Sequence, residues 1–508
     1  MSVDGEARAA GGPVSTGPPP MAWRPVGGVA LALGAVLLAT SSGYGYFRDE
    51  LYFRLLGQDL AWGYRDQLGP VTPALARVTR ELLGDTVWAL RVPCALLLAL
   101  TVLVVAATAR EFGGGRNAQL LAATGTAVSV FPLMIGHVLL TSTMDLPLSS
   151  LTILCVVRAL LRADGRWWLA CGAVIGLALY NKKLVLLLAL GIVVGLLLTG
   201  PRAVFRDRFL WLGALLAVLV GAPTLLHEVR TGWPMLETAS ALTAKNGTAN
   251  RIAFVPQQLL LLGPFLVPVW LAGAVGLWRD RAWRPARALV AGCLVCAVLF
   301  LVTGGRPDYT VPLLLLLLAA GSVSAVRWLG RKPGRPPLLA AGLVLNAVLA
   351  SIVALPVLPQ RVMAGSGLAA VDPIFAGQTG WPELAAQTSA AYRSLPEREQ
   401  AGTVVVTANY GQAGALDRFG ADDRLPAVYS GHNQLYYRGV PPETATTVIA
   451  VGLKPAFTAG RFRECRTYGR IGEGHAEVVN DDAGAVVQVC RGPRAPWPAL
   501  WPEFRHVD

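Results

Sequence analysis

The chain has 508 residues, of which 54% are hydrophobic and only 15% are charged, and its mean hydropathy is +0.50. This composition is typical of a polytopic membrane protein and argues against a soluble multidomain one. The net charge of +13 does not predict nucleic-acid binding, because the arginines gather in short clusters between apolar runs.

The first 22 residues are rich in Gly, Pro, Ala and Ser, which predicts a disordered cytoplasmic tail at 1–22. The apolar run at 26–40 is not clearly followed by a small-residue cleavage site of the kind that ends a signal peptide. Because further apolar runs follow it, we expect it to stay in the protein as the first transmembrane helix.

About eleven apolar runs can cross a bilayer, which takes roughly 17–25 residues. They lie near 26–44, 87–108, 117–138, 144–161, 167–181, 184–200, 209–226, 256–278, 286–303, 308–326 and 337–357. The basic clusters occupy every second connection, and an odd number of spans with a cytoplasmic N-terminus satisfies all of them. We therefore expect a transmembrane domain at 23–360 with outer segments at 45–86 and 227–255.

The first outer segment mixes charged residues with apolar ones, which favours a helix lying in the membrane interface. Its apolar residues are Leu51, Phe53, Leu55, Leu56, Leu60 and Trp62. Four aromatic residues nearby are expected at the level of the lipid headgroups, namely Tyr44, Tyr46, Phe47 and Tyr52.

The chain changes character after residue 360. A buried strand is predicted at 403–407, a turn at 409–411, a helix at 413–419 and a second strand at 446–451. This order predicts a small α/β domain at 361–508, placed outside the cytoplasm by the odd number of spans.

Of the seven cysteines, Cys465 and Cys490 lie in this C-terminal region and are candidates for a disulfide worth about 3 kcal/mol. The other five lie in apolar runs. Two of these, Cys293 and Cys296, form a CxxC, but inside a span we expect packing residues rather than a redox or zinc site.

Asp49 and Glu50 follow the first span, where the chain should leave the bilayer on its outer side. A carboxylate at that place can take a proton from an acceptor hydroxyl or bind a metal. The alternative is an interfacial charge paired with Arg48. We favour the functional interpretation, because charge next to hydrocarbon is costly to keep.

Asp145 lies at the outer mouth of the fourth span, in Thr143-Met144-Asp145-Leu146-Pro147. Asp is a good helix N-cap, and Pro is tolerated in a first helical turn. Asp145 is therefore interpreted either as a helix N-cap or as a functional carboxylate, and one residue can serve as both.

Lys182 and Lys183 are predicted on the outer face between two spans, and Arg306 takes an equivalent place. Positive charge on this side runs against the topology bias and calls for an anionic partner. That partner is either a lipid headgroup or a polyprenyl phosphate.

His227 and Glu228 open the second outer segment and are candidate substrate or metal ligands. The sequence therefore leaves open whether the protein binds a divalent metal. The sequence has no Walker loop, no GxGxxG after a strand, and no Asp-x-Asp pair in a cytoplasmic loop for a metal–nucleotide-sugar complex. An enzyme facing outward then needs a donor that arrives through the membrane, and a polyprenyl-phosphate sugar has that form.

The acidic pair after the first span resembles the signature of membrane glycosyltransferases with a GT-C fold. The chain is most similar to glycosyltransferase family 39 and its bacterial relatives of the protein-mannosyltransferase and aminoarabinose-transferase type. Other similar segments follow in the family's order, at 69–73, 83–91, 143–148, 177–182, 223–234 and 306–309. Two departures stand out: Gly69-Pro70-Val71 replaces the His-Pro-Pro of many relatives, and the family's single lysine is doubled here.

This resemblance implies a plasma-membrane glycosyltransferase that uses a polyprenyl-phosphate sugar, inverts the anomeric carbon and acts on the extracytoplasmic face. The acceptor is a protein, a lipid or a wall glycan. We expect Asp49 to be the general base, Glu50 to assist or position it, and Asp145 to orient acceptor or sugar. The cations expected to stabilise the departing phosphate are Lys182, Lys183 and Arg306.

Two other classes of protein remain as alternatives. A flippase or transporter of lipid-linked sugars usually has ionisable groups near the bilayer midplane and internal repeats, and neither stands out here. A non-catalytic partner in cell-envelope assembly would use the C-terminal domain as a binding module.

Overall fold

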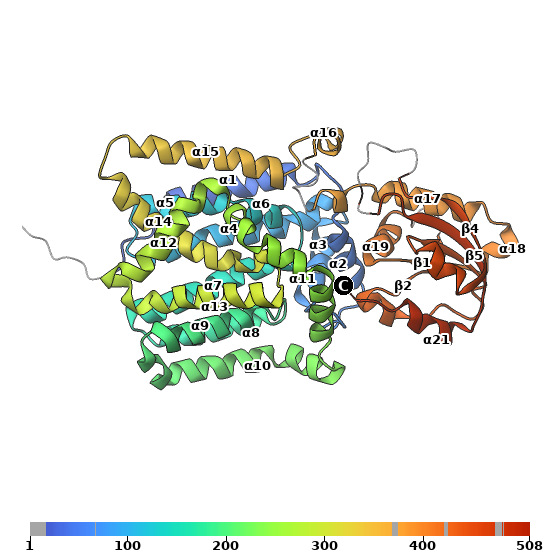
Figure 1. The fold of residues 1–508 in the computed structure, drawn as a ribbon, viewed down its shortest axis with the longest axis horizontal. Helices are drawn as coiled ribbons and strands as arrows, with labels where there is room; N and C mark the ends of the chain where they lie inside the picture. The colour runs from blue at the N-terminus through green and yellow to red at the C-terminus, as the bar shows by residue number, and fades with distance from the viewer. Residues whose placement is uncertain are drawn as a thin grey trace, which may run out of the picture.

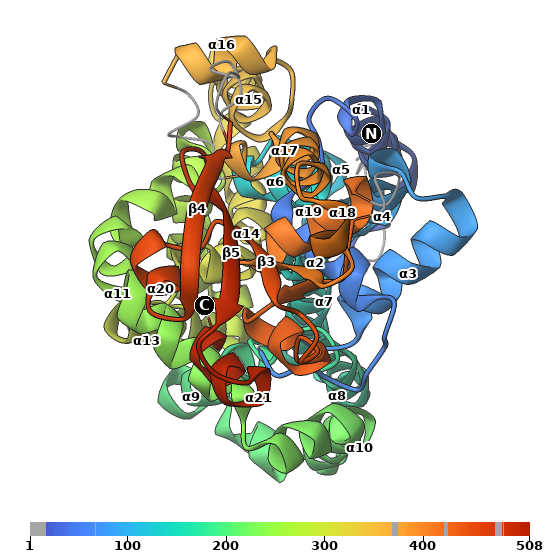
Figure 2. The ribbon, with the colours of Figure 1, turned by 90° about the vertical axis from the view of Figure 1, so that its right-hand side faces the viewer.

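The computed structural model describes residues 17–66, 68–367, 374–420, 425–472, 480 and 482–507. A bundle of long apolar helices carries a small sheet domain at one end (Figure 1). Figure 2, which looks at the molecule from that end, shows the strands in front of the bundle.

Seven helices in the described part of the chain are long and apolar enough to cross a membrane, or nine if two bent pairs each form one span. The seven are α1 (Trp23–Thr40), α4 (Val87–Glu111), α7 (Thr141–Arg162), α10 (Arg208–Thr231), α13 (Arg287–Thr303), α14 (Val311–Leu329) and α15 (Arg335–Ala354). Short 3-10 turns, η3 (Arg281–Ala286) and η4 (Pro307–Thr310), lead into α13 and α14.

The bent pairs are α5 (Arg116–Ala127) with α6 (Val130–His137), at 59°, and α11 (Pro234–Leu260) with α12 (Val267–Arg279), at 68°. Two shorter apolar helices are α8 (Arg166–Ala178) and α9 (Val185–Thr199). Each of the eleven predicted runs corresponds to one of these helices or pairs, and the predicted polytopic α-helical fold is confirmed.

A buried asparagine on α15 stabilises both bends. Asn346 Nδ2 donates to the carbonyl of Val128, at the α5–α6 break, at 2.8 Å, and to that of Leu262, after α11, at 2.9 Å. A broken helix leaves backbone carbonyls unpaired, and at membrane depth protein groups have to satisfy them. The asparagine therefore allows the two spans to bend.

The basic connections meet at the end of the bundle opposite the sheet domain. The buried Glu111 pairs with Arg158 at 3.0 Å and with Arg162 at 2.6 Å, which joins the ends of α4 and α7. Arg327 pairs with Asp280 at 2.8 Å and joins the ends of α14 and α12. These connections share one side of the bundle, as the predicted alternation requires.

The described part of the N-terminal tail lies at this same end. Arg110 donates to the carbonyl of Pro19 at 2.6 Å, and the amide of Ala22 donates to Gln119 at 2.8 Å. Disorder was expected here, but these contacts hold residues 17–22 against α4 and α5. The rest of the expected tail, 1–16, lies outside the described residues.

The C-terminal domain has a five-stranded sheet in the order β2-β1-β3-β5-β4. Its strands are β1 (Thr403–Thr407), β2 (Val428–Ser430), β3 (Thr447–Val451), β4 (Phe462–Arg470) and β5 (Val486–Pro493). The first three are parallel, and β5 and β4 add to β3 as an antiparallel pair. The predicted strands and the small C-terminal sheet domain are confirmed.

Helices cover both faces of this sheet, so its central strands are buried on both sides. The helices of the domain and of its approach are α16 (Gln360–Gly365), α17 (Trp381–Arg393), α18 (Glu397–Gln400), α19 (Tyr410–Phe419), α20 (Pro455–Ala459) and α21 (Trp497–Leu500). Further 3-10 turns are η1 (Arg202–Arg206), η2 (Pro264–Leu266), η6 (Ala376–Gln378), η7 (Asn433–Arg438) and η8 (Trp501–Phe504).

The predicted turn at 409–411 is wrong, because α19 already begins there. Asn409 is its N-cap, and its side chain accepts from the backbone amide of Gln412 at 2.9 Å. Tyr410 is therefore the first residue of a helix. Cys465 and Cys490, which face each other on β4 and β5, form the predicted disulfide.

The first outer segment differs from the prediction of an interfacial helix. It forms α2 (Arg48–Leu56) and α3 (Val71–Leu83), and the apolar side chains of α2 are buried in one core with α19 and the sheet. The aromatic residues expected at the headgroups are buried as well. The exposed apolar residues of this segment are Leu60 and Trp62 after α2 and Val78, Leu82 and Leu83 on α3.

Candidate active site

Asp49 lies in the first turn of α2, between the bundle and the sheet domain. A carboxylate is favoured there by the partial positive charge of the helix N-terminus. Tyr410 Oη donates to Asp49 Oδ1 at 2.8 Å, and Arg48 Nε is 3.8 Å from the same oxygen. The Asp49 side chain stays 27% exposed, so a substrate can reach it.

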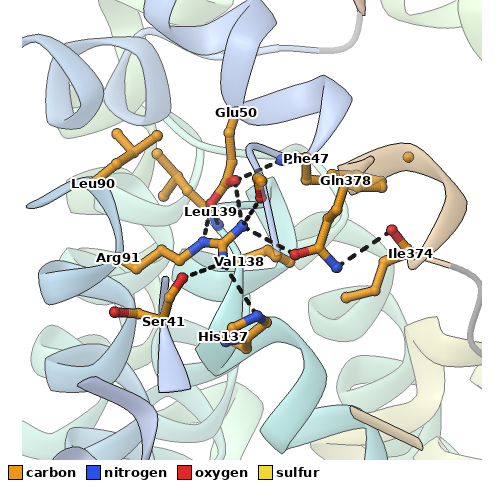
Figure 3. A network of polar contacts seen from close by, with 12 residues as sticks. Ser41, Phe47, Glu50, Leu90, Arg91, His137, Val138, Leu139, Ile374 and Gln378 are labelled. Carbon is orange, nitrogen blue, oxygen red and sulfur yellow. Dashed lines mark hydrogen bonds and ion pairs between the residues drawn. The ribbon is translucent and has the colours of Figure 1, made fainter. Parts of the chain in front are cut away.

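Glu50 is fully buried and has a different environment. Its carboxylate pairs with Arg91, with Nε–Oε1 at 3.0 Å and Nη2–Oε2 at 2.8 Å, and both side chains are at most 1% exposed (Figure 3). It also accepts from the amides of Phe47, at 2.8 Å, and Leu139, at 2.9 Å. These contacts occupy both oxygens and support a positioning role for Glu50 rather than an acid–base one.

Arg91 connects Glu50 to three other segments. Its guanidinium donates to the carbonyls of Ser41, at 2.6 Å, and Gly45, at 2.9 Å, and to Gln378 Oε1 at 3.1 Å (Figure 3). One cation therefore joins four segments: the end of α1, the start of α2, α4 and the entry to the sheet domain. The sequence analysis missed this residue, although an arginine inside an apolar run was the signal that could have found it.

The two adjacent lysines have separate roles in the structure. Lys183 Nζ is 2.7 Å from Glu228 Oε1, and this ion pair between the α8–α9 turn and α10 is almost fully buried. Glu228 is therefore paired with a lysine, which disfavours His227 and Glu228 as candidate metal ligands. Among the residues that the structure describes, no three His, Cys, Asp or Glu side chains gather in a metal-binding arrangement.

The loop before α3 is hydrogen-bonded to the turn at 180–183 that carries the two lysines. The amides of Gly69 and Val71 donate to the carbonyls of Asn181, at 3.1 Å, and Tyr180, at 3.2 Å. A Cβ at Gly69 would lie 1.9 Å from the Tyr180 carbonyl oxygen, so only glycine permits this approach. The departure from His-Pro-Pro thus has a physical reason in this chain.

Lys182 lies over the ring of Tyr309, with Nζ 4.4 Å from its centroid. Lys182 is also an electrostatic partner of Asp145. Asp145, Asp308 and Tyr309 line a small cavity between α6, α7, η4 and the start of α14. Asp145 is buried, and its Oδ1 has no hydrogen-bond partner among the described residues. Because Asp145 is the fifth residue of α7, it is not the N-cap of that helix.

Arg306 pairs with Asp308, one of the residues that line this cavity. Its Nε is 2.9 Å from Asp308 Oδ1, and its side chain is about half exposed. Asp308 is the main cause that raises the pKa of Arg306 above its ordinary value, and Asp49 contributes to the same shift. The guanidinium is therefore a fixed positive charge within electrostatic range of both carboxylates.

Asp66, between α2 and α3, was not among the predicted site residues. It is 2% exposed, and its carboxylate accepts from Tyr52 Oη at 2.6 Å and from the Leu68 amide at 2.8 Å. Burial raises the pKa of this carboxyl from 3.8 to about 6. The folded protein therefore binds this proton more tightly than the unfolded chain does.

As a result, the contribution of Asp66 to stability should fall as the pH rises from about 4 to about 6 and level off above that. A shift of about two pKa units corresponds to about 3 kcal/mol. Thermal unfolding of the wild type and Asp66→Asn between about pH 4 and pH 7 measures this. As the pH rises through that window, the melting temperature of the wild type should fall relative to that of Asp66→Asn. If the two melting temperatures changed in parallel with pH, the assignment would be contradicted.

Two of three comparisons with known proteins found proteins similar to this chain. The family model described as Dolichyl-phosphate-mannose-protein mannosyltransferase matches residues 67–227, and the search of curated proteins found no match. ArnT from Cupriavidus metallidurans in the apo state is similar with a TM-score of 0.61 and 17% identity, over 91% of this chain and 96% of that one.

Two further solved structures are similar over most of this chain. The Archaeoglobus fulgidus oligosaccharyltransferase in complex with Zn and sulfate has a TM-score of 0.52 and 12% identity, over 84% of this chain and 68% of that one. The arabinofuranosyltransferase AftD from Mycobacteria has a TM-score of 0.52 and 15% identity, over 93% of this chain and 40% of that one.

The chain is therefore a multi-pass membrane protein with the fold of the GT-C glycosyltransferases. The family model, which covers the end of the first outer segment through α10, agrees with that class. The predicted likeness to GT-C membrane glycosyltransferases is confirmed, and the transporter alternative is not favoured.

Proposed function

We propose that this protein transfers a sugar from a polyprenyl-phosphate carrier to an acceptor on the extracytoplasmic face of the membrane, with Asp49 as the general base. The observation that carries this proposal is the partly exposed carboxylate of Asp49 on the same end of the bundle as a small cavity lined by Asp145, Asp308 and Tyr309, whose ring Lys182 covers. A structure of ArnT bound to undecaprenyl phosphate and one of AglB with a dolichol-phosphate support this class of donor.

The reaction requires one proton transfer and one displacement. Asp49 takes the proton of the acceptor hydroxyl or amine as that atom bonds to the anomeric carbon. The bond between this carbon and the phosphate oxygen breaks, and the phosphate leaves with the polyprenol. In this proposal Lys182 and Arg306 stabilise the charge that grows on the phosphate, and Asp145 orients the sugar.

The orientation of the chain is part of the proposal. The basic connections and residues 17–22 lie at one end of the bundle, and the sheet domain lies at the other. Under the positive-inside rule, the basic end faces the cytoplasm. The domain at 361–508 and its disulfide are then extracytoplasmic, in a compartment where disulfides persist.

The proposal is tested with purified protein in lipid nanodiscs and a panel of radiolabelled undecaprenyl-phosphate sugars carrying mannose, arabinofuranose or glucose. The acceptor is an envelope fraction from cells that lack the gene. Transfer of label to this fraction, with release of undecaprenyl phosphate, is the expected result. A transporter would instead move intact donor between the leaflets of a proteoliposome, and that outcome would refute the transferase.

The two lysines should respond differently to substitution. Lys182→Met removes a cation that can meet the phosphate and should raise the donor KM about tenfold or more, because hydrogen bonds to charged groups contribute about 1.5–3 kcal/mol. Lys183→Met leaves Glu228 buried without its cation and should lower the free energy of unfolding by about 3–5 kcal/mol. Donor titrations and thermal unfolding of both variants check this, and the reverse pattern would contradict the assignment.

A further inference from the structure

We propose that Tyr410 of the C-terminal domain is a positioning residue for Asp49, so that the domain completes the candidate active site rather than only covering it. This inference rests on the proposed function. Its direct evidence is the hydrogen bond from Tyr410 Oη to Asp49 Oδ1 at 2.8 Å, between residues 361 positions apart in the chain.

The ring of Tyr410 is fixed by stacking on both faces. It lies 4.6 Å from the Tyr52 ring, at an interplanar angle of 27°, and 4.7 Å from the His432 ring, at 30°. His432 stacks in turn on His506 at 4.5 Å. Tyr52 is anchored by its hydrogen bond to Asp66, so the phenol is held by groups from both domains.

The backbone of Tyr410 is fixed as well. The Asn409 cap places Tyr410 at the start of α19, which crosses α2 at close range. A Cβ at Gly414 would lie 2.8 Å from the carbonyl carbon and oxygen of Leu51, and one at Gly411 would lie 3.0 Å from Arg48 Cβ. Two glycines one helical turn apart therefore bring α19 close enough for the phenol to reach Asp49.

These contacts assign Tyr410 a function that a structural tyrosine would not have. A hydrogen bond from a neutral donor to an ionised carboxylate is charge-assisted and fixes the direction of the carboxylate. A base held in one orientation meets the acceptor proton in a productive geometry more often. The expected loss on removal of the hydroxyl is therefore in kcat rather than in donor binding.

Tyr410→Phe tests this, because it keeps both ring stacks and removes only the O–H group. The matched control is Tyr468→Phe, which removes the hydroxyl of an exposed tyrosine on β4 of the same domain. Both full-length variants are assayed in nanodiscs with the undecaprenyl-phosphate sugar that the wild type uses and the same envelope acceptor. The thermal unfolding of each is measured in parallel.

We expect Tyr410→Phe to lower kcat about 10- to 100-fold, with an unchanged donor KM and a melting temperature within a few degrees of the wild type, since only one hydrogen bond to a partly exposed carboxylate is lost. The control should match the wild type. A wild-type kcat for Tyr410→Phe, a loss confined to donor KM, or a loss that follows unfolding would overturn the inference. A wild-type protein that transfers no sugar would refute the proposed function, and this inference with it.

Discussion

Asp49→Asn is expected to abolish sugar transfer and leave the protein folded. The amide has nearly the shape of the carboxylate and can still accept the hydrogen bond from Tyr410, but it cannot take a proton from the acceptor. A positioned general base contributes roughly 10²- to 10⁴-fold to the rate. The drop should therefore appear in kcat by at least about 100-fold, measured as label transferred per minute in nanodiscs.

Two controls separate the loss of the base from a general effect of removing a carboxylate and from unfolding. Asp59→Asn changes a highly exposed carboxylate just beyond α2 that pairs with Arg438 of the C-terminal domain, and it should keep near wild-type activity. The melting temperature of Asp49→Asn should stay within a few degrees of the wild type, because the residue is partly exposed. An active Asp49→Asn protein would refute the assignment of the base, whatever the other residues do.

Local patterns in the sequence were sufficient to predict much of the fold. Hydropathy predicts the eleven apolar runs, short β-branched apolar runs predict the strands at 403–407 and 446–451, and the expected compartment predicts the Cys465–Cys490 disulfide. Such features depend on residues that are close together in the sequence, so a local pattern is enough to predict them. Even the two bent spans were located, although their bends depend on Asn346 from a distant helix.

Most of the errors have one physical cause, which is contact between segments far apart in the chain. The apolar face of α2 was expected against lipid, but α19 buries it instead. Tyr410 was placed in a turn although its helix begins with a local cap, in which Asn409 accepts from the Gln412 amide. Its partner Asp49, in contrast, is distant in the chain. The doubled lysine was also ambiguous in the sequence, and only the position of Glu228 separates Lys183 from Lys182.

Arg91→Met is expected to destabilise the protein strongly. It would leave the Glu50 carboxylate, which is 0% exposed, without its cation, and would remove donors from Ser41, Gly45 and Gln378 (Figure 3). Breaking a buried ion pair on one side costs about 3–5 kcal/mol. Chemical unfolding in detergent should show a loss of this size.

The control for this loss is Arg77→Met on α3, where an exposed i,i+4 pair with Glu81 is worth at most about 0.5 kcal/mol. Glu50→Gln/Arg91→Met should lose less than the two single substitutions combined, because the double variant leaves no unpaired buried charge. Additive losses would show that the two side chains act separately. Because Glu50 also fixes the first turn of α2, Arg91→Met should lose activity together with stability. Asp49→Asn should lose activity alone. This contrast separates the residue that positions the base from the base itself.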